Sequence, residues 1–188
     1  MKKKHWYRRV ITVLLTTALL VGLLYQFGHK TYMERTYPVQ FSQYVEEYSA
    51  EYSVPEDLIY AIIQVESGFE PNAISEVHAI GLMQMTEETY DWLSSKTGDT
   101  GTFKELYTPE YSIQYGTYFL SILMDRYEGD YTTVAAAYHA GMGSVNSWLT
   151  DAANSDDGKT LTNVPADDTA HYVTKVLHAV EIYQEKLS

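Results

Sequence analysis

The chain has 188 residues, of which 45% are hydrophobic, and it carries 25 acidic side chains against 13 basic ones. This length and apolar content predict one folded domain with an appendage. Cysteine is absent, which excludes disulfides, thiolate zinc sites and a cysteine nucleophile. The six histidines show no metal-ligand spacing, so we expect neither a metal nor a cofactor.

The basic residues are concentrated at the N-terminus. Residues 1–9 hold five of the thirteen, which leaves eight basic residues against 25 acidic ones in the rest of the chain. Such an acidic domain repels nucleic acid, so a nucleic-acid partner is not expected.

An uncharged, mostly aliphatic run extends from Val10 to Gly28. At about 1.5 Å per residue it nearly matches a hydrocarbon core of about 30 Å, and aromatic residues flank it at both ends. No small-residue cleavage site follows, so we predict a retained transmembrane signal anchor over residues 10–28; a cleaved signal peptide and a buried helix are the alternatives. The positive-inside rule makes residues 1–9 a cytoplasmic tail and predicts a single-pass cell-membrane protein with an extracytoplasmic domain.

A short tether is predicted over residues 29–40, followed by a domain over residues 41–188. Within it, helical periodicity predicts a leading helix from Phe41 to Tyr52. The next helix runs to Glu66, with Pro55 in its first turn and capping-box spacing between Ser53 and Glu56, although Val54 could equally be the cap. Further helices are expected over 87–98, 108–129, 131–140, 144–151 and from 167 or 168 to 187, with Thr86 capping the first and Asp130 the third. A polar loop is expected over residues 97–107, and Gly116 inside the long helix predicts close packing on a neighbouring element. No convincing strand appears, so the fold class is all-α with at most a small hairpin.

Glu66 is the first candidate for chemistry. At about 100° per residue it lies on the apolar face of its helix, close to the direction of Ile59 and Ile62, in the last turn. Burial and the negative end of the helix dipole both disfavour its charged form. A carboxyl group kept protonated near neutral pH is what a general acid needs. A frayed, solvated helix-end glutamate is the alternative at this point.

The segments Glu66-Ser67-Gly68-Phe69, Asn72-Ala73-Ile74-Ser75 and Gly81-Leu82-Met83-Gln84 resemble the opening of the lytic transglycosylase domain. This is the soluble-lytic-transglycosylase-like branch of the lysozyme superfamily, and the resemblance spans roughly residues 52 to 185. It implies a lysozyme-like fold, Glu66 as the catalytic acid, and a sugar groove lined by the residues that follow from the matched motifs. In chain order these are Ser67, Met83, Gln84, Tyr138, His139, Asp168 and Tyr172.

Three positions depart from the family pattern. His139 stands where Ala-Tyr-Asn-x-Gly has its Asn, and Asp168 replaces the Glu of Glu-Thr-x-x-Tyr. His139 either changes substrate binding and its response to pH or acts as a simple donor. Asp168, one methylene shorter, reaches the site through water or acts only as a helix cap. His78 occupies a position where Gly is common, and it is strained if its φ is positive.

Glycoside cleavage usually needs two carboxylates, and only one is well placed here. The resemblance implies a reaction without a second one: Glu66 protonates the glycosidic oxygen and then, as a base, deprotonates the C6 hydroxyl of N-acetylmuramic acid, which closes a 1,6-anhydro ring. The expected activity is therefore peptidoglycan lytic transglycosylase, acting on glycan strands as a monomer. The alternatives are a hydrolytic muramidase and a catalytically weak glycan-binding or scaffold protein.

Overall fold

The computed structural model describes residues 2–188, with side chains described for Trp6, Thr12 and residues 14–188. The chain divides into two compact units, one ending at Pro38 and one from Val39 to Ser188. Each unit is taken by itself below.

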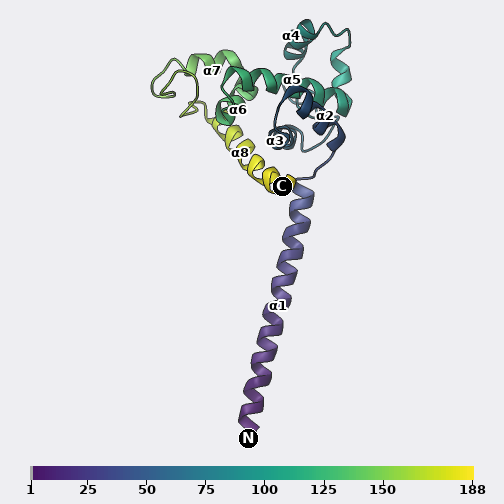
Figure 1. The fold of residues 1–188 in the computed structure, drawn as a ribbon, viewed down its shortest axis with the longest axis vertical. Helices are drawn as coiled ribbons and strands as arrows, with labels where there is room; N and C mark the ends of the chain where they lie inside the picture. Colours follow the sequence, from purple (N-terminus) through teal and green to yellow (C-terminus); the bar gives the residue numbers. More distant parts are fainter. Residues whose placement is uncertain (1) are drawn as a thin grey trace. The chain divides into compact units, whose positions relative to one another are not determined.

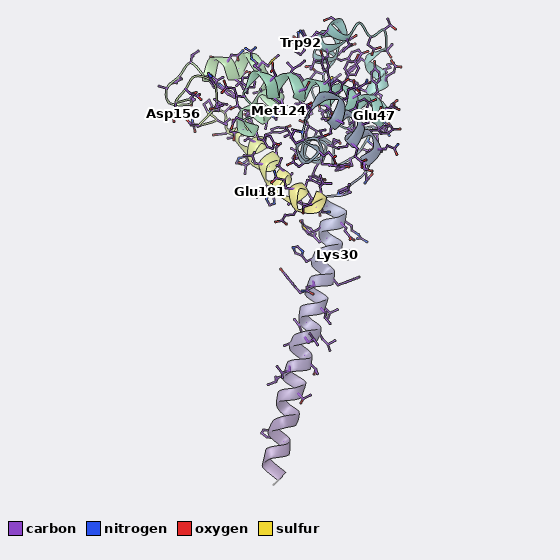
Figure 2. The ribbon with its side chains drawn as sticks, viewed as in Figure 1. Lys30, Glu47, Trp92, Met124, Asp156 and Glu181 are labelled. Carbon is purple, nitrogen blue, oxygen red and sulfur yellow. The ribbon has the colours of Figure 1, made fainter. Side chains whose placement is uncertain are left out.

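The first unit is one long helix, α1 (Lys2–Thr36) (Figure 1). The predicted tether, residues 29–40, is helical as far as Thr36, after which the chain loses regular structure. Lys30, labelled in Figure 2, forms an exposed ion pair at 3.8 Å with Glu34, and this four-residue spacing suits a helix. Most of its described Leu, Val and aromatic side chains are strongly exposed. Among the described residues, no helix reaches the length and apolarity that crossing a membrane demands.

The second unit is built around α3 (Glu56–Glu66). Six consecutive residues, from Leu58 to Ile63, are completely buried, as expected of a helix that is apolar on every side. The C-terminal helix α8 (Asp167–Leu187) packs along it more extensively than any other element, and α2 (Ser42–Tyr52) also contacts it (Figure 1). Each fully buried Leu or Ile contributes about 1.5–3 kcal/mol, so α3 is the main source of stability near the site.

The predicted capping box at the start of α3 is wrong. Ser53 has φ 56° and terminates α2, its N–H bonding to the Ser49 carbonyl, so it cannot cap the next helix. The helix instead begins directly after Pro55, without a side-chain cap. Proline has no backbone N–H that a cap would have to satisfy, and its fixed φ suits the start of a helix.

The middle of the chain follows the predicted order with one addition. Thr86 caps α4 (Glu87–Thr97) by accepting a hydrogen bond from the Thr89 N–H at 3.3 Å, as predicted. The predicted polar loop before residue 108 contains a 3₁₀ helix, η1 (Phe103–Tyr107), closed by a capping box between Thr102 and Glu105. The long helix α5 (Pro109–Arg126) then starts at its proline.

The last three helices complete the domain. Asp130 caps α6 (Tyr131–Ala140) as predicted, with its Oδ1 accepting from the Thr133 N–H at 2.8 Å. The short helix α7 (Met142–Trp148) begins two residues earlier than predicted. Asp156 lies in the loop that joins α7 to α8 (Figure 2).

Over the described residues no strand is formed, so the all-α prediction is confirmed. In place of a small hairpin there are two isolated bridges, Ile74 with Ile80 and Ile80 with Met85.

Candidate active site

Glu66 is the last residue of α3, and Ser67 directly follows it. The Ser67 hydroxyl donates to the carbonyl of Leu82 at 2.8 Å. This bond ties the end of the helix to the Gly81–Met85 segment, 15 residues further along the chain. Ser67 therefore fixes where the Glu66 side chain leaves the helix.

The loop between Glu66 and Met85 is held in a strained shape. Phe69, His78 and Gln84 all have positive φ, at 68°, 64° and 46°. The conditional prediction for His78 is thus confirmed, and a non-glycine residue in this region costs about 1–2 kcal/mol. Gly81, at φ 82°, cannot be replaced by another residue without moving its surroundings, because a Cβ there would lie 2.2 Å from the Leu106 carbonyl oxygen.

The Gly81–Met85 segment is clamped from three sides. Gln84 donates through Nε2 to the carbonyls of Ala73 at 3.1 Å and Gly81 at 2.9 Å. The buried Met83 donates its N–H to the Ser112 hydroxyl on α5 at 3.2 Å. Its carbonyl accepts from the Tyr138 hydroxyl on α6 at 2.8 Å. The matched residues therefore form a rigid wall rather than freely moving side chains.

The Glu66 carboxyl group meets two tyrosines. The Tyr172 hydroxyl donates to Glu66 Oε1 at 2.6 Å, which joins α8 to the end of α3. Burial raises the pKa of Glu66 from its ordinary value of 4.5 to about 7, although the Tyr172 hydrogen bond lowers it. The pKa values of Tyr138 and Tyr172 are raised well above normal, first by burial and then by the charge of Glu66. Both hydroxyls therefore keep their protons while Glu66 titrates near neutrality.

The geometry suits proton transfer. Because the side chain of Glu66 is partly buried yet still reaches solvent, a substrate can approach the carboxyl group. An acid with a pKa near the working pH can both give and take a proton, which is the requirement for acid–base catalysis by one group. The solvated-glutamate alternative is therefore wrong.

His139 and Asp168 differ in how closely they are connected to Glu66. The exposed His139 ring stacks on Tyr172 with ring centroids 4.5 Å apart, and its Nδ1 is 3.2 Å from the Thr169 hydroxyl. Asp168 is exposed, and its Oδ1 accepts the N–H of Thr169 at 2.8 Å, a local bond in the first turn of α8. His139 thus touches the partner of Glu66, whereas the described bonds of Asp168 reach only Thr169.

Two supporting residues were missed by the sequence analysis. Ser112 holds the backbone of Met83, and Thr169 links Asp168 to His139. Ser112 could have been found, since it lies four residues before Gly116 and so shares the face of α5 that packs on Met83. No sequence signal distinguishes Thr169 from other threonines near a helix start.

The central helix of this all-α domain thus ends in one partly buried acid that lies beside two tyrosines. The family model described as Transglycosylase SLT domain matches residues 43–161 of this chain. The chain therefore belongs to this family.

Individual relatives agree with this assignment. The chain is 34% identical over 165 residues to the membrane-bound lytic murein transglycosylase C of Serratia proteamaculans, which covers 76% of this chain and 46% of the relative. It is 28% identical to the soluble lytic murein transglycosylase of Escherichia coli K12, over 78% of this chain and 23% of that protein. The chain thus spans about half, or less, of the curated relatives that it matches.

Solved structures show the same fold. An inactive mutant of the lytic transglycosylase Slt from Pseudomonas aeruginosa superimposes with a TM-score of 0.73 and 28% identity, over 82% of this chain and 25% of that one. The 70-kDa soluble lytic transglycosylase in complex with bulgecin A gives a TM-score of 0.75 and 26% identity, over 83% and 26%. The predicted lysozyme-like fold is confirmed.

Proposed function

We propose that this chain is a peptidoglycan lytic transglycosylase that cleaves the β-1,4 bond between N-acetylmuramic acid and N-acetylglucosamine. The observation that carries this proposal is the Glu66 carboxyl group, whose pKa of about 7 lets one residue act as acid and then as base. Membership of the Transglycosylase SLT domain family supports the same reaction.

In the proposed mechanism Glu66 first donates its proton to the glycosidic oxygen, and the bond to the anomeric carbon breaks. The N-acetyl group of the substrate stabilises the positive charge that develops at that carbon. The Glu66 carboxylate then removes the proton of the C6 hydroxyl, whose oxygen attacks the anomeric carbon and closes the 1,6-anhydro ring. The proton returns to Glu66 and no water is consumed, and because the attack is intramolecular, positioning supplies much of the acceleration.

The surroundings of Glu66 favour this one-acid scheme. Glu70 and Glu76, the nearest carboxylates in the following loop, are exposed, and Glu70 is engaged with the backbone N–H of Asn72. Neither shares the buried environment that raises the pKa of Glu66. A hydrolysing pair of carboxylates would instead flank the bond from both sides.

The remaining site residues are assigned roles on the same basis. Tyr172 orients Glu66, Tyr138 braces the Met83 carbonyl, and His139 presents an exposed ring beside Tyr172 to the sugar. Gln84 and the buried Met83 hold the backbone of the wall next to Glu66, Ser67 ties that wall to the end of α3, and Asp168 contacts substrate only through water. A muramidase with the same acid and a catalytically weak scaffold are the competing functions.

We further propose that residues 10–28 anchor the chain in the cell membrane, with residues 1–9 in the cytoplasm and the domain from residue 41 outside it as a monomer. The support is the uncharged run itself, the basic residues before it, and the continuous helix that contains it. Similarity to relatives that are named membrane-bound agrees with this placement.

The function is tested by incubating the full chain in detergent micelles with purified peptidoglycan and identifying soluble products by mass spectrometry. We expect muropeptides lighter than the hydrolysed forms by the mass of one water. Glu66→Gln should reduce product by at least about a thousandfold, since the acid is used in both steps. Glu70→Gln, the same chemical change at an exposed neighbour, should leave the yield near that of wild type.

Other products would decide between the alternatives. Muropeptides with reducing ends would establish the muramidase. Binding to the wall without release of any product from the wild-type chain would favour the scaffold, and His139 and Asp168 would then be the first positions to revert to Asn and Glu.

A further inference from the structure

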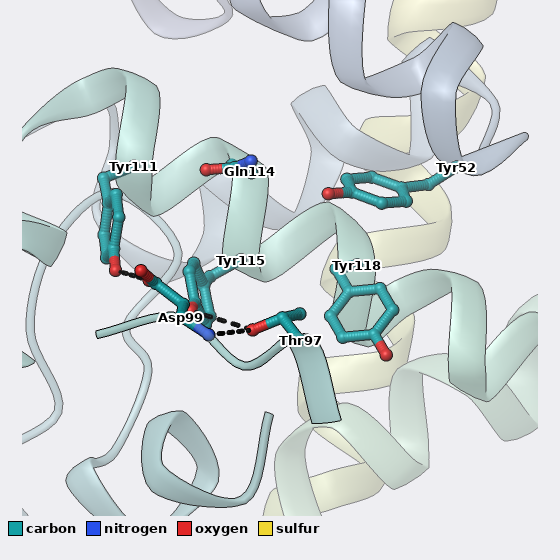
Figure 3. Close-up of a pocket in the computed structure, with 7 residues that line it drawn as sticks. All are labelled: Tyr52, Thr97, Asp99, Tyr111, Gln114, Tyr115 and Tyr118. Carbon is teal, nitrogen blue, oxygen red and sulfur yellow. Dashed lines mark hydrogen bonds between the residues drawn. The ribbon is translucent and has the colours of Figure 1, made fainter. Parts of the chain in front are cut away.

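A pocket of about 270 Å³ lies beside α5 and the end of α2, and none of its lining residues belongs to the site at Glu66 (Figure 3). Ser112 and Gly116 direct one face of this helix toward Met83. Tyr111 and Tyr118 lie about 100–120° around the helix from Ser112, and both line the pocket. The pocket is therefore separate from the site at Glu66.

Aromatic rings form the walls of this pocket. Tyr52, at the end of α2, meets Tyr118 of α5 with ring centroids 5.4 Å apart. Tyr111 and Tyr115, also on α5, meet at 4.8 Å. Figure 3 shows these two pairs at opposite ends of the group, with the Gln114 side chain between them. Such walls offer ring faces and phenolic oxygens rather than flexible aliphatic surface.

A fixed carboxylate forms one end of the pocket. Asp99 Oδ2 accepts hydrogen bonds from the Tyr111 hydroxyl and, at 2.6 Å, from the Tyr115 hydroxyl, while Oδ1 accepts the Gly101 N–H at 3.1 Å. These bonds lower the pKa of Asp99, so the group is anionic at neutral pH. Both tyrosines donate their protons to Asp99, so toward a ligand their oxygens can act only as acceptors. The Tyr111 oxygen also lies 3.3 Å from the Tyr90 hydroxyl, and the Tyr115 oxygen 3.5 Å from that of Thr97.

The surroundings add negative charge. A neighbouring pocket of about 270 Å³ shares Tyr111 and Gln114 with the first and is also lined by Glu105 and Glu110. Of the residues that line the two pockets, none is Lys, Arg or His. No basic side chain within these walls therefore competes for Asp99, and the local field favours a cation.

We propose that this pocket binds a primary ammonium group carried on a flexible chain, such as the side chain of a lysine-like residue in a peptide. Three N–H donors match the acceptors of Asp99, Tyr111 and Tyr115, and the flanking rings attract the positive charge. A neutral sugar would gain stacking on the rings but nothing from the carboxylates. The site does not depend on the reaction at Glu66.

The test is a titration of the full chain in detergent micelles, followed by saturation-transfer NMR of the ligand. The probe is Nα-acetyl-lysine amide, and the matched ligand is its Nε-acetylated form, which keeps the chain but loses the charge. Asp99→Asn should weaken binding of the probe about tenfold. Asp125→Asn, at an exposed position on α5 outside the pocket, makes the same change in net charge and should alter binding less than twofold.

A second variant guards against a folding defect in the first. Tyr118→Leu leaves the Asp99 hydrogen bonds intact but removes one ring, and we expect it to weaken binding several-fold with an unchanged circular dichroism spectrum. The proposal is overturned by equal binding of the two ligands, by equal effects of Asp99→Asn and Asp125→Asn, or by no effect of Tyr118→Leu. Preferential binding of N-acetylglucosamine that Tyr118→Leu abolishes would overturn it in favour of a sugar site.

Discussion

The protonation of Glu66 is set by two opposing influences, burial and the Tyr172 hydroxyl. Burial raises its pKa, and the hydrogen bond at 2.6 Å lowers it by favouring the carboxylate. Tyr172→Phe removes only the second influence, so the pKa should rise further. Hydrogen bonds to charged groups are worth about 1.5–3 kcal/mol, which corresponds to about one pH unit or more.

This change is measured in the pH profile of product release. Wild-type activity should decline on the alkaline side as Glu66 loses its proton above pH 7, and in Tyr172→Phe the decline should begin at higher pH. Tyr183→Phe, a buried change on the same helix, is the control for packing and should leave the profile in place. An alkaline limb that moves to lower pH in Tyr172→Phe would contradict the assignment.

The same pKa makes a prediction about stability. The pKa of Glu66 is raised on folding from about 4.5 to about 7, so its contribution is complete below pH 4.5 and is lost as pH rises through 7. Between pH 5 and pH 8 the wild type should lose about 2 kcal/mol of unfolding free energy relative to Glu66→Gln, which cannot ionise. Urea unfolding of both proteins at the two pH values measures this difference, and an equal response of the two would show that Glu66 is not desolvated.

At the scale of elements, the contact between α5 and the Gly81–Met85 segment requires a glycine. A Cβ at Gly116 would lie 2.2 Å from the Sδ atom and 2.9 Å from the Cβ atom of Met83. The sulfur could swing away, but the Cβ contact can be relieved only by moving the backbone that carries the carbonyl bonded to Tyr138. The sequence predicts close packing at this glycine, and the structure confirms it.

Gly116→Ala should therefore destabilise the domain by about 1–3 kcal/mol, since overpacking outweighs a helix-propensity gain of about 1 kcal/mol. Activity should fall about tenfold or more, because small displacements at the wall disturb the site. Gly143→Ala in α7 is the matched control, since nothing lies within 4 Å of its new Cβ. Thermal unfolding and product yield of the two variants give the comparison, and equal behaviour would refute the packing argument.

Helices with a polar start were predictable from the sequence because their caps are local. Thr86 and Asp130 each bond an N–H three residues ahead, and that spacing is visible in the sequence. The cap predicted at Ser53 was wrong because the left-handed conformation of this residue ends the preceding helix instead of starting the next one. The 3₁₀ helix at Phe103–Tyr107 was missed because a five-residue turn leaves little periodicity to detect.

The site was predictable only in part, because some of its contacts join residues that are far apart in the sequence. Glu66 could be placed from its helical face, but its contact with Tyr172 joins residues 106 positions apart and depends on α8 packing along α3. The resemblance supplied Tyr172, whereas periodicity alone would have assigned it to the core. The pocket at Asp99 had no sequence signal at all, since its tyrosines come from two helices and its carboxylate from a loop.

At the scale of the whole molecule, charge and hydropathy are segregated along the chain. Five of the thirteen basic residues precede the uncharged run, and the rest of the chain is strongly acidic. The proposed orientation follows from this order, because basic residues are retained on the cytoplasmic side of a membrane. In the proposed orientation, the acidic domain would meet an anionic wall without strong nonspecific attraction, and recognition would then depend on the proposed sugar site and the proposed pocket at Asp99.

The natural absence of cysteine makes the orientation directly testable. The single substitution His5→Cys places a thiol before the uncharged run, and Ser188→Cys places one at the last residue of the domain. In intact cells a membrane-impermeant maleimide should label the chain carrying Ser188→Cys, because that thiol lies outside. It should label the chain carrying His5→Cys only after the membrane is permeabilised, and the cysteine-free wild type should stay unlabelled. Labelling of both thiols in intact cells, or of His5→Cys alone, would contradict the proposed anchor.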